Sequence, residues 1–560
     1  MIQHAAPIVA RLSLGGDKII LAGYSPDALE FYHSLPAARY DKGSRTWSCM
    51  RTPVAIHRIA TFPGAQLADT LMQQSIDVRG RLLEASQFQD PDHAPAIAQP
   101  LSKTPLWHHQ LLAFGFGRRV DACLLGMEMG CGKSLDAVTL VVYWGCKTVL
   151  VLCPRSVMGV WRREFEKHAA RSVRVFIAEN GTVKRKRDDA ALFMAQPTTD
   201  MGVVVINYES AWREPFGDWA LGRTWDAVIA DESHRIAAHD SIQSKWCARL
   251  GLKAKRRLCL TGTPLTQSPL SLFGQFRFLD PGLVGTSWTH FNNRYATHNN
   301  PSIPQMVTGY KNQAELADRM KLVTFRCRAE DVLDLPDKHH IERRFALSPA
   351  AMRVYRQLEE ELIAEVDGGV VTVPNALVKL VRLSQVCSGY LPLDETKEVK
   401  EIDDSKIEVL QELLEDMDQR EPVVVFCRFR QDLAKLADLA EKLGRRYGEQ
   451  SGSRKDALDD KAMMREDIDL AGVQIASGGL GVDFTRARYA VYYSIGQSLV
   501  EYKQSIARLH RPGQTRRVTY YHLIAENTVD VLAYKALERN QEIVDAVLSV
   551  FKSHNRREIA

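Results

Sequence analysis

Short apolar runs alternate with amphipathic stretches along most of the chain. Between 106 and 280, runs without polar alternation occur at 123–125, 148–152, 203–206, 227–230 and 258–260. The same pattern returns after 405, at 423–426, 473–476, 490–493 and 518–521. Such runs, separated by helical patterns, are typical of a parallel sheet that is buried on both faces. The chain is therefore predicted to contain two α/β lobes, at 101–284 and 405–545.

The remaining segments have other patterns. Residues 1–60 predict a small α+β domain, with a strand near 18–21, a helix that starts at Ser25-Pro26, a hairpin through 41–43 and a short helix after Thr52-Pro53. Residues 61–100 are rich in Pro, Gln, Ala and Asp and predict a partly helical linker. Helical periodicity dominates 285–404 and predicts a helical insertion between the lobes, and 546–560 form a basic tail.

A glycine-rich segment follows the first apolar run of the first lobe. It consists of Glu128, Met129, Gly130, Cys131, Gly132, Lys133 and Ser134. Glycines allow backbone N–H groups to approach phosphate oxygens, and the following helix N-terminus adds positive potential. Lys133 is predicted to reach the β and γ phosphates of a nucleotide, and Ser134 to bind Mg²⁺. Because Met127 stands where the phosphate-loop signature has its first glycine, a simple strand-to-helix turn remains an alternative on this motif alone.

Two acids, Asp231 and Glu232, directly follow the strand predicted at 227–230. The end of a strand delivers both side chains to one edge of the sheet. Asp231 is predicted to hold Mg²⁺ through water, and Glu232 to orient and deprotonate the water that attacks the γ-phosphate. An exposed Asp-Glu pair can also be a solvated turn, but the preceding strand favours a catalytic role.

The second lobe contains two arginines that suit a phosphate. Arg508 and Arg511 are three residues apart and are predicted to share one helical face. They are expected to act as arginine fingers when the lobes close, although two arginines at this spacing can also form a solvated face. A glycine-rich loop at 477–483, with Gly481 and Asp483, again follows a predicted strand.

Taken in order, these motifs resemble those of superfamily-two helicases, and specifically the Swi/Snf-type ATPases, over about residues 100–540. The ordered set comprises a motif ending in Gln110, the phosphate loop, Pro154-Arg155-Ser156, Asn207-Tyr208-Glu209, Asp231-Glu232-Ser233-His234, Leu260-Thr261-Gly262-Thr263-Pro264, Phe426-Cys427-Arg428-Phe429, the second glycine-rich loop and the arginine segment with Gln504. Residues 272–282 and 326–338 resemble the connector and helical protrusion of this branch.

The resemblance implies two RecA-like parallel-sheet lobes with a helical insertion between them and a small α+β N-terminal domain. It implies ATP and Mg²⁺ as cofactors, with Gln110 at the adenine and with Gly481 and Asp483 at the nucleotide. It assigns coupling of hydrolysis to motion to His234, Thr261, Gly262, Thr263 and Gln504. It assigns DNA contacts to Arg155, Ser156, Tyr208, Thr263 and Arg428, and it implies movement along duplex DNA without strand separation.

Two residues depart from the family pattern. Met127 replaces an acid and Cys131 replaces a leucine. Because the phosphate cradle works through backbone N–H groups, nucleotide binding is expected to survive both changes, whereas the rate of hydrolysis stays open.

The N-terminal domain faintly resembles the HepA-related (HARP) domain of annealing helicases over 35–47. Arg39, Tyr40 and Trp47 are predicted to offer backbone contacts and a stacking surface to branched or single-stranded DNA. Residues 1–60 carry seven basic and four acidic residues, which suits this role. Alternatively, Tyr40 and Trp47 pack a small core.

Composition adds little to this picture. The 560 residues include 73 basic and 68 acidic groups, and a net charge of +5 favours a polyanionic partner only weakly. The ten cysteines form no C-x-x-C pair, and neither His108-His109 nor His339-His340 has a partner at ligand spacing, so we expect neither disulfides nor a zinc site. No apolar run reaches 18 residues, so no membrane span is expected. The basic run at 184–187 is expected to be a solvated loop or, alternatively, a DNA track.

The functional prediction is an ATP-dependent translocase on duplex or branched DNA that remodels DNA structures or proteins bound to DNA. We expect a monomeric cytoplasmic protein of bacterial or phage origin. Three alternatives remain: a strand-separating or annealing helicase that acts on forks, a DNA-binding scaffold whose ATPase is silent, and a phosphate-loop switch that acts on protein alone.

Overall fold

The structure is a computed structural model that describes residues 8–96, 101–262, 268–298, 307–367, 373–392, 399–459, 463–475, 482–496 and 498–539. The chain divides into two compact units, Met1–Val332 and Leu333–Ala560. Each unit is described separately below.

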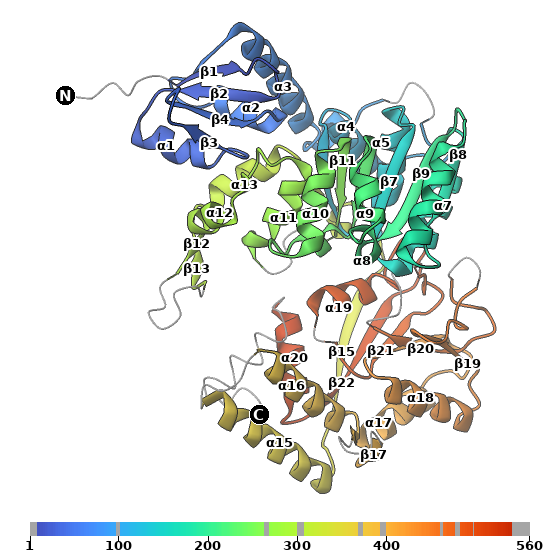
Figure 1. The fold of residues 1–560 in the computed structure, drawn as a ribbon. Coiled ribbons are helices and arrows are strands. Elements are labelled where there is room, and N and C mark those ends of the chain that lie inside the picture. The colour runs from blue at the N-terminus through green and yellow to red at the C-terminus, as the bar shows by residue number, and fades with distance from the viewer. Residues whose placement is uncertain are drawn as a thin grey trace. The chain divides into compact units, whose positions relative to one another are not determined.

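The first unit begins with a small α+β domain, blue in Figure 1. Its sheet has the strand order β3-β4-β2-β1-β5. The strands are β1 (Val9–Leu12), β2 (Lys18–Ala22), β3 (Arg39–Asp41), β4 (Thr46–Met50) and β5 (Gln66–Leu67), and the helices are α1 (Pro26–His33), α2 (Pro53–Ala60) and α3 (Asp69–Gln87). The predicted helix starts are confirmed, because the side chain of Ser25 accepts from the backbone N of Ala28 and that of Thr52 from the backbone N of Ala55. Strands β1 and β5 were not predicted.

Helix α2 attaches this domain to the end of the first lobe. Arg58 is buried, and its Nη1 donates to the carbonyl oxygens of Ser34 (3.1 Å) and Gly282 (2.7 Å). The backbone N of Val54 donates to Oδ2 of Asp280 (3.2 Å). Since buried polar groups are costly when they are unpaired, these bonds fix the domain to residues 280–282.

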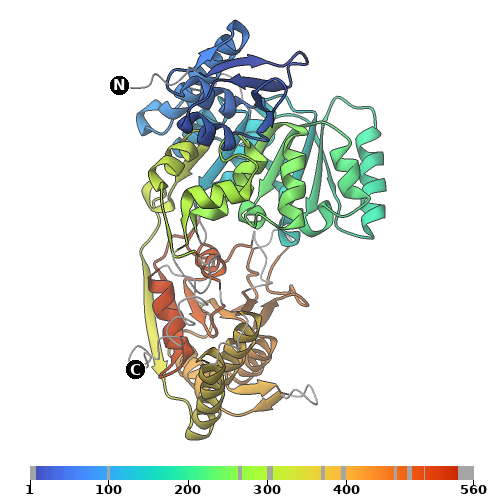
Figure 2. The same cartoon turned by 60° about the vertical axis from the view of Figure 1, so that its left-hand side comes forward.

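A seven-stranded sheet forms the core of the first lobe, with the order β14-β6-β11-β10-β7-β9-β8. All of its strand pairs are parallel, as the apolar runs predicted. The strands are β6 (Ala122–Met127), β7 (Thr148–Cys153), β8 (Val173–Ile177), β9 (Met201–Asn207), β10 (Trp225–Asp231), β11 (Ala254–Leu260) and β14 (Thr324–Cys327). Strands β6 and β9 are buried along their whole length, which fits a sheet covered on both faces (Figure 2).

Helices surround this sheet. They are α4 (His108–Gly117), α5 (Lys133–Tyr143), α6 (Met158–His168), α7 (Val183–Ala195), α8 (Tyr208–Ala211), α9 (Phe216–Leu221), α10 (Ile242–Gly251), α11 (Leu272–Leu279), α12 (Trp288–Tyr295), α13 (Gln313–Lys321) and α14 (Ala329–Val332), with a small hairpin of β12 (Ala296–Thr297) and β13 (Gly309–Tyr310). The basic run at 184–187 is not a loop, because Thr182 caps α7 and the run forms its first turns. Nζ of Lys186 donates to Oγ of Ser210 (3.0 Å), so one of the four basic side chains of this run binds another helix of the lobe.

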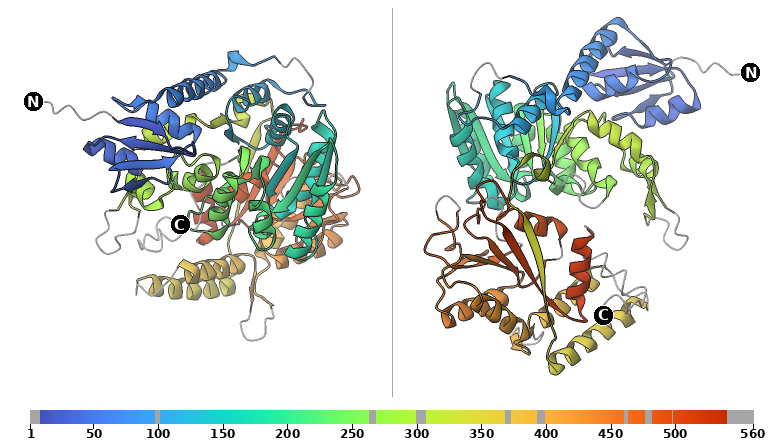
Figure 3. Two further views of the ribbon diagram at one scale, coloured as in Figure 1. Left: turned by 45° about the horizontal axis from the view of Figure 1, so that its top comes forward. Right: turned by 180° about the vertical axis from the view of Figure 1, so that it is seen from behind.

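The second unit contains a six-stranded sheet with the order β15-β22-β21-β18-β20-β19 and parallel pairing throughout. Its strands are β15 (Lys338–Phe345), β18 (Val423–Cys427), β19 (Tyr447–Gln450), β20 (Leu470–Gln474), β21 (Tyr489–Tyr492) and β22 (Val518–Ala525). The helices are α15 (Pro349–Asp367), α16 (Val373–Cys387), α17 (Ser405–Glu415), α18 (Arg430–Lys442), α19 (Leu499–Ile506) and α20 (Val529–Glu538), and β16 (Tyr390–Pro392) pairs with β17 (Val399–Glu401). Figure 3 shows α15 and α16 side by side.

The segment 285–404 is mainly helical, as predicted, but it also supplies one strand to each large sheet. Strand β14 pairs with β6, and β15 pairs with β22. Neither strand was predicted, because β14 has only four residues and β15 reads Lys-His-His-Ile-Glu-Arg-Arg-Phe. Charged side chains are common on edge strands, where they discourage pairing with other chains.

Asp469 anchors the start of β20 in the second unit. Its carboxylate is buried and accepts from Nε of Arg446 (2.8 Å) and from Nη1 of Arg420 (2.8 Å). Burial alone would raise the pKa of Asp469, but the hydrogen bonds from Arg446 and Arg420 lower it to about 2. The charged carboxylate therefore contributes stability above its ordinary pKa, and this contribution is lost as the pH falls toward 2.

We expect Asp469→Asn to lower the free energy of unfolding by about 2–3 kcal/mol, because the charge-assisted hydrogen bonds from Arg446 and Arg420 are lost. Denaturant unfolding at pH 7 measures the change. Asp467→Asn is the matched control, since Asp467 is exposed and pairs with Arg465. Equal stability of the two variants would contradict this role for Asp469.

Candidate active site

The candidate phosphate loop connects β6 to α5. Gly130 has a φ of 86° and Gly132 a φ of 82°, so both lie in the left-handed region that favours glycine. Gly132 is the N-cap residue of α5, whose first turn begins at Lys133. The first N–H groups of a helix have no partner within it, so the loop presents backbone donors to an anion.

Gln110 lies against this loop. It is buried on α4, its Oε1 accepts from the backbone N of Trp107 (2.8 Å), and its Nε2 donates to the carbonyl oxygen of Cys131 (3.1 Å). A Cβ added to Gly132 would collide with Nε2 of Gln110. The predicted adenine motif and the predicted phosphate loop are therefore in direct contact.

The loop residues that depart from the family pattern are both buried. Met127 is the last residue of β6 and Cys131 lies between the two glycines. Glu128 next to them is fixed at both ends: its backbone N donates to the carbonyl oxygen of Cys327 (2.9 Å), and its Oε2 accepts from the backbone N of Ala329 (3.0 Å). Met127 is thus a core residue, which supports the expectation that the substitution leaves the backbone cradle intact.

Asp231 and Glu232 lie at the same edge of the sheet as the loop. Strand β11 separates β10 from β6, and Leu260 pairs with both Asp231 and Leu125. The backbone N of Thr261 donates to the carbonyl oxygen of Leu125 (3.2 Å). A Cβ on Gly262 would lie 3.6 Å from the carbonyl oxygen of Met127. The acids, Thr261 and Gly262 are therefore gathered around the loop, whereas Thr263 lies outside the described residues.

The two carboxyl groups differ in their surroundings. Oδ2 of Asp231 accepts from Nε1 of Trp161 (2.9 Å), and Oδ1 accepts from the backbone N of Glu232 (2.9 Å). Burial, and after it the negative charge of Glu232, raise the pKa of Asp231 to about 7. Burial alone would also raise the pKa of Glu232, but the adjacent His234 and the charge of Lys133 hold it below its usual value. Nδ1 of His234 lies 3.3 Å from Oε2 of Glu232.

No role for Trp161 was predicted from the sequence. Its indole N–H orients Asp231, a function that no spacing along the chain predicts. Glu232 has a φ of 49°, a left-handed conformation that costs an ordinary residue about 1 kcal/mol or more. Such strain is found at functional sites that the surrounding structure holds in place.

The arginine segment of the second unit is not a continuous helix, so the prediction of a shared helical face is wrong. Helix α19 ends at Ile506, and the residues from Ala507 to Pro512 form turns. The carbonyl oxygen of Ile506 accepts from the backbone N of Leu509 and of His510 and from the hydroxyl of Tyr520 (2.8 Å). The bond from His510 keeps the helical spacing, but the bond from Leu509 tightens the chain into a turn, and Pro512 cannot donate to continue a helix.

Arg508 and Arg511 nevertheless have the properties of phosphate ligands. Arg508 is 7% exposed, and its Nη1 has no hydrogen-bond partner among the described residues. Burial lowers the pKa of Arg508 to about 10, so it stays charged at neutral pH. Nη1 of Arg511 donates to the carbonyl oxygen of Val482 (3.3 Å), and its Nε lies 3.8 Å from Oδ2 of Asp483. Gln504 lies on α19, and Gly481 is outside the described residues.

The predicted DNA contacts divide into exposed and buried side chains. Arg155 and Ser156 are exposed in a short turn after β7, and Arg428 follows β18 with its guanidinium 5.1 Å from the ring centre of Phe429. Tyr208 is only 1% exposed. Its hydroxyl donates to the carbonyl oxygen of Asp231 (2.8 Å), so the prediction that this side chain contacts DNA is wrong.

In the N-terminal domain, Tyr40 and Trp47 face each other across β3 and β4. Tyr40 is 50% exposed, and Arg39 is exposed beside it. Trp47 is half-buried and packs its ring against Tyr32 (5.6 Å between centres) and against Tyr40 (5.5 Å). Trp47 thus packs against the core of the domain, while one face of the Tyr40 ring is exposed to solvent.

A family model described as the SNF2-related domain matches residues 59–390. The chain belongs to the SNF2-related family. A second model, the helicase conserved C-terminal domain, matches residues 405–513. The resemblance to Swi/Snf-type ATPases is confirmed by this pair of matches, which together include both lobe sheets except β22.

Several curated SNF2-related proteins are similar to this chain. The mouse protein named DNA annealing helicase and endonuclease ZRANB3 is 25% identical over 446 residues, which are 77% of this chain and 40% of the mouse protein. A Caenorhabditis elegans homologue of SWI/SNF-related matrix-associated actin-dependent regulator of chromatin subfamily A-like protein 1 is 24% identical, over 95% of this chain and 75% of that one. The Bacillus subtilis putative ATP-dependent helicase/translocase YwqA is 26% identical, over 79% and 48%. The chain thus spans about 40% of the length of the ZRANB3 proteins.

Among solved structures, the Sulfolobus solfataricus SWI2/SNF2 ATPase core in complex with dsDNA is 22% identical and has a TM-score of 0.40, over 83% of this chain and 99% of that one. In the described part of this chain, no helix is both long and apolar enough to cross a membrane.

Proposed function

We propose that this SNF2-related chain hydrolyses ATP to move along double-stranded or branched DNA, and that it thereby remodels DNA structures or protein–DNA complexes. The observation that carries the proposal is the meeting of the glycine loop, Lys133, Asp231 and Glu232 at one sheet edge, since Lys133 interacts electrostatically with both acids. A loop of backbone donors beside paired acids suits phosphoryl transfer to water.

Each residue of this edge has a proposed role. The loop from Glu128 to Ser134 is proposed to bind the phosphates, and Gln110 to contact the base. Ser134 and Asp231 are the residues that would hold Mg²⁺, which supplies charge neutralisation at the phosphates when it is bound. Asp231 suits this role because each of its oxygens accepts only one described hydrogen bond, and a carboxylate oxygen has room for two.

Glu232 is the proposed general base, and His234 orients it. Arg508 and Arg511 are proposed to meet the γ-phosphate when the lobes close, with Asp483 and Gly481 contributing from the same lobe. Thr261, Gly262, Thr263, His234 and Gln504 are proposed to couple hydrolysis to motion. Arg155, Ser156, Thr263 and Arg428 are proposed to contact the DNA backbone, which carries no sequence information.

ATP hydrolysis on single-stranded, duplex and forked DNA tests the proposal. We expect duplex or forked DNA to stimulate phosphate release, the stimulation to fall steeply with salt, and Lys133→Ala to abolish it. ATP-driven displacement of the third strand from a DNA triplex tests movement along the duplex. Hydrolysis without DNA stimulation at any ionic strength would instead favour a switch that acts on protein, and absence of hydrolysis would favour a scaffold.

A second candidate is an annealing activity, which the name of the mouse relative suggests. It predicts ATP-dependent reannealing of complementary strands covered by a single-strand-binding protein. A strand-separating helicase predicts the opposite outcome on a forked duplex, so one set of labelled forks distinguishes the two activities.

The contact between Gly132 and Gln110 provides a test of the phosphate loop. We expect Gly132→Ala to weaken ATP binding at least tenfold, because the new Cβ would collide with the Gln110 amide and distort the loop. Gly145→Ala is the matched control: Gly145 also has a positive φ of 62°, but nothing lies within 4 Å of its added Cβ. Equal ATP affinity in both variants, measured by calorimetry, would contradict the assignment of this loop.

Tyr40 provides a test of the N-terminal domain. We expect Tyr40→Ala to weaken the affinity for forked DNA by about fivefold to a hundredfold, since stacking of a base on an aromatic ring contributes about 1–3 kcal/mol. Tyr24→Ala is the control, because Tyr24 is 67% exposed in the same domain. Fluorescence anisotropy on forked DNA measures the difference. An unchanged affinity of Tyr40→Ala would remove the domain's proposed role in targeting.

A further inference from the structure

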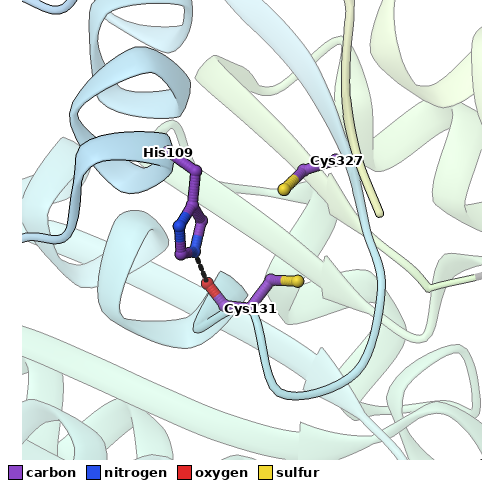
Figure 4. A group of neighbouring side chains, drawn as sticks. All are labelled: His109, Cys131 and Cys327. Carbon is purple, nitrogen blue, oxygen red and sulfur yellow. Dashed lines mark hydrogen bonds between the residues drawn. The ribbon is translucent and has the colours of Figure 1, made fainter. Parts of the chain in front are cut away.

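Three potential metal ligands meet beside the phosphate loop. They are His109 on α4, Cys131 in the loop and Cys327 at the end of β14, and their ligand atoms all lie within 4.8 Å of one another (Figure 4). All three side chains are buried. The cluster was not predicted from the sequence, because its members come from three distant segments and share no ligand spacing along the chain.

The donor set has a clear chemical preference. Two thiolates and an imidazole suit thiophilic cations such as Zn²⁺, Cd²⁺ and Cu⁺, whereas Mg²⁺ and Ca²⁺ prefer oxygen ligands. Zinc bonds of about 2.3 Å to sulfur and about 2.0–2.1 Å to nitrogen place tetrahedral ligand atoms about 3.5–4 Å apart. Since the observed separations extend up to 4.8 Å, the three ligand atoms must move closer together to bind one tetrahedral cation.

A buried acid beside the cluster provides a second, independent observation. Asp136 on α5 is 0% exposed, and neither of its carboxylate oxygens has a hydrogen-bond partner in the part of the chain that the structure describes. It interacts electrostatically with Cys131 and with Cys327. A buried carboxyl group without hydrogen bonds is costly, and a cation at the cluster would offset that cost.

We propose that His109, Cys131 and Cys327 bind one thiophilic cation of the Zn²⁺ class beside the buried Asp136, with the two thiolates balancing its charge. Binding releases the two thiol protons to solvent. Nε2 of His109 now lies 3.0 Å from the carbonyl oxygen of Cys131, and the imidazole exchanges this contact for the cation. The fourth tetrahedral position is left to water.

The position of Cys131 gives the site a consequence for the nucleotide. Cys131 lies between Gly130 and Gly132, and its carbonyl oxygen also accepts from Gln110. A cation that draws Cys131 toward Cys327 and His109 would shift the loop away from the conformation that presents its backbone donors to an anion. Resting on the proposed function, we expect the bound cation to weaken ATP binding, so that the site acts as an inhibitory sensor of soft metal ions.

Titration of the metal-free full-length chain with Cd²⁺, in the presence of a thiol-free reductant, tests the site directly. We expect one Cd²⁺ per chain with thiolate-to-metal charge-transfer absorption, and at least tenfold weaker binding in Cys327→Ala and in His109→Ala. Cys123→Ala is the matched control, because Cys123 is a buried cysteine on the strand that leads into the loop. Thermal unfolding of each variant verifies that it is folded.

Binding that is equally tight in Cys327→Ala and in Cys123→Ala would overturn the proposal, as would absence of the charge-transfer band. These outcomes do not depend on ATP hydrolysis, so they are separate from failure of the proposed function. In a second step, ATP affinity is measured with and without one equivalent of Cd²⁺. We expect at least a tenfold loss in the unaltered chain and none in Cys327→Ala, which also controls for chelation of Cd²⁺ by the nucleotide. Equal losses in both chains would overturn the inhibitory role.

Discussion

Glu232→Gln is expected to lower the rate of DNA-stimulated ATP hydrolysis by about a hundredfold to ten-thousandfold, the usual contribution of a general base. Glutamine keeps the size of the side chain and its contact with His234 but cannot take a proton from water. The pKa of Glu232 lies below its usual value, so the carboxylate is available as a base throughout the neutral range. Steady-state phosphate release on duplex DNA measures the effect.

The variant should still bind ATP, because the phosphate loop is unaltered. Asp240→Asn is the matched control, since Asp240 is an exposed acid that follows the same strand. If Glu232→Gln hydrolyses ATP within threefold of the unaltered chain, Glu232 is not the base. If it loses ATP binding as well, the glutamine has disturbed the loop, and Glu232 supports the structure of the site rather than the proton transfer.

Arg508→Ala is expected to lower the hydrolysis rate by about a thousandfold or more, as removal of an arginine finger does in other nucleotide hydrolases. Its guanidinium is buried and charged, and one nitrogen lacks a partner among the described residues, which suits a ligand that arrives from elsewhere. ATP affinity should change little, because the arginine acts mainly in the transition state. Single-turnover hydrolysis and equilibrium binding separate the two quantities.

Arg508→Lys should also be impaired, because lysine keeps the charge but loses the planar fork of donors. Arg517→Ala is the control: Arg517 is 63% exposed in the same segment and lies 3.5 Å from Asp337. Circular dichroism melting shows whether removal of a buried arginine unfolds the second unit. A folded Arg508→Ala chain that hydrolyses ATP at the normal rate would exclude the finger.

Local chemistry made the N-terminal helices and the central strands predictable. Ser25 and Thr52 cap helices where a proline follows them, and caps depend only on neighbouring residues. Strands β6, β9 and β18 are buried along their whole length, so nearly all of their side chains are apolar. The order of the motifs then predicted the family, because each strand end carries its own short signature.

Features that depend on contacts between distant segments could not be predicted. The charged residues of β15 lack an apolar pattern that would predict a strand. This segment forms a strand by pairing with β22, 180 residues later. The turn at Arg508 includes a bond from the hydroxyl of Tyr520 to the carbonyl oxygen of Ile506, and the hydroxyl of the buried Tyr208 donates to the carbonyl oxygen of Asp231. In each case a local pattern was compatible with the predicted state, and a tertiary hydrogen bond selected another.

Arg58 determines how the small N-terminal domain moves with the first lobe. Its guanidinium donates to one carbonyl oxygen of its own domain and to one of the first lobe, so buried hydrogen bonds connect the N-terminal domain to the first lobe. The N-terminal domain is therefore fixed against the first lobe rather than joined to it by a flexible linker. If the protein moves along DNA as proposed, Tyr40 moves together with the first lobe at each step. The spacing between the DNA held there and the DNA at the motor would then be set by the fold.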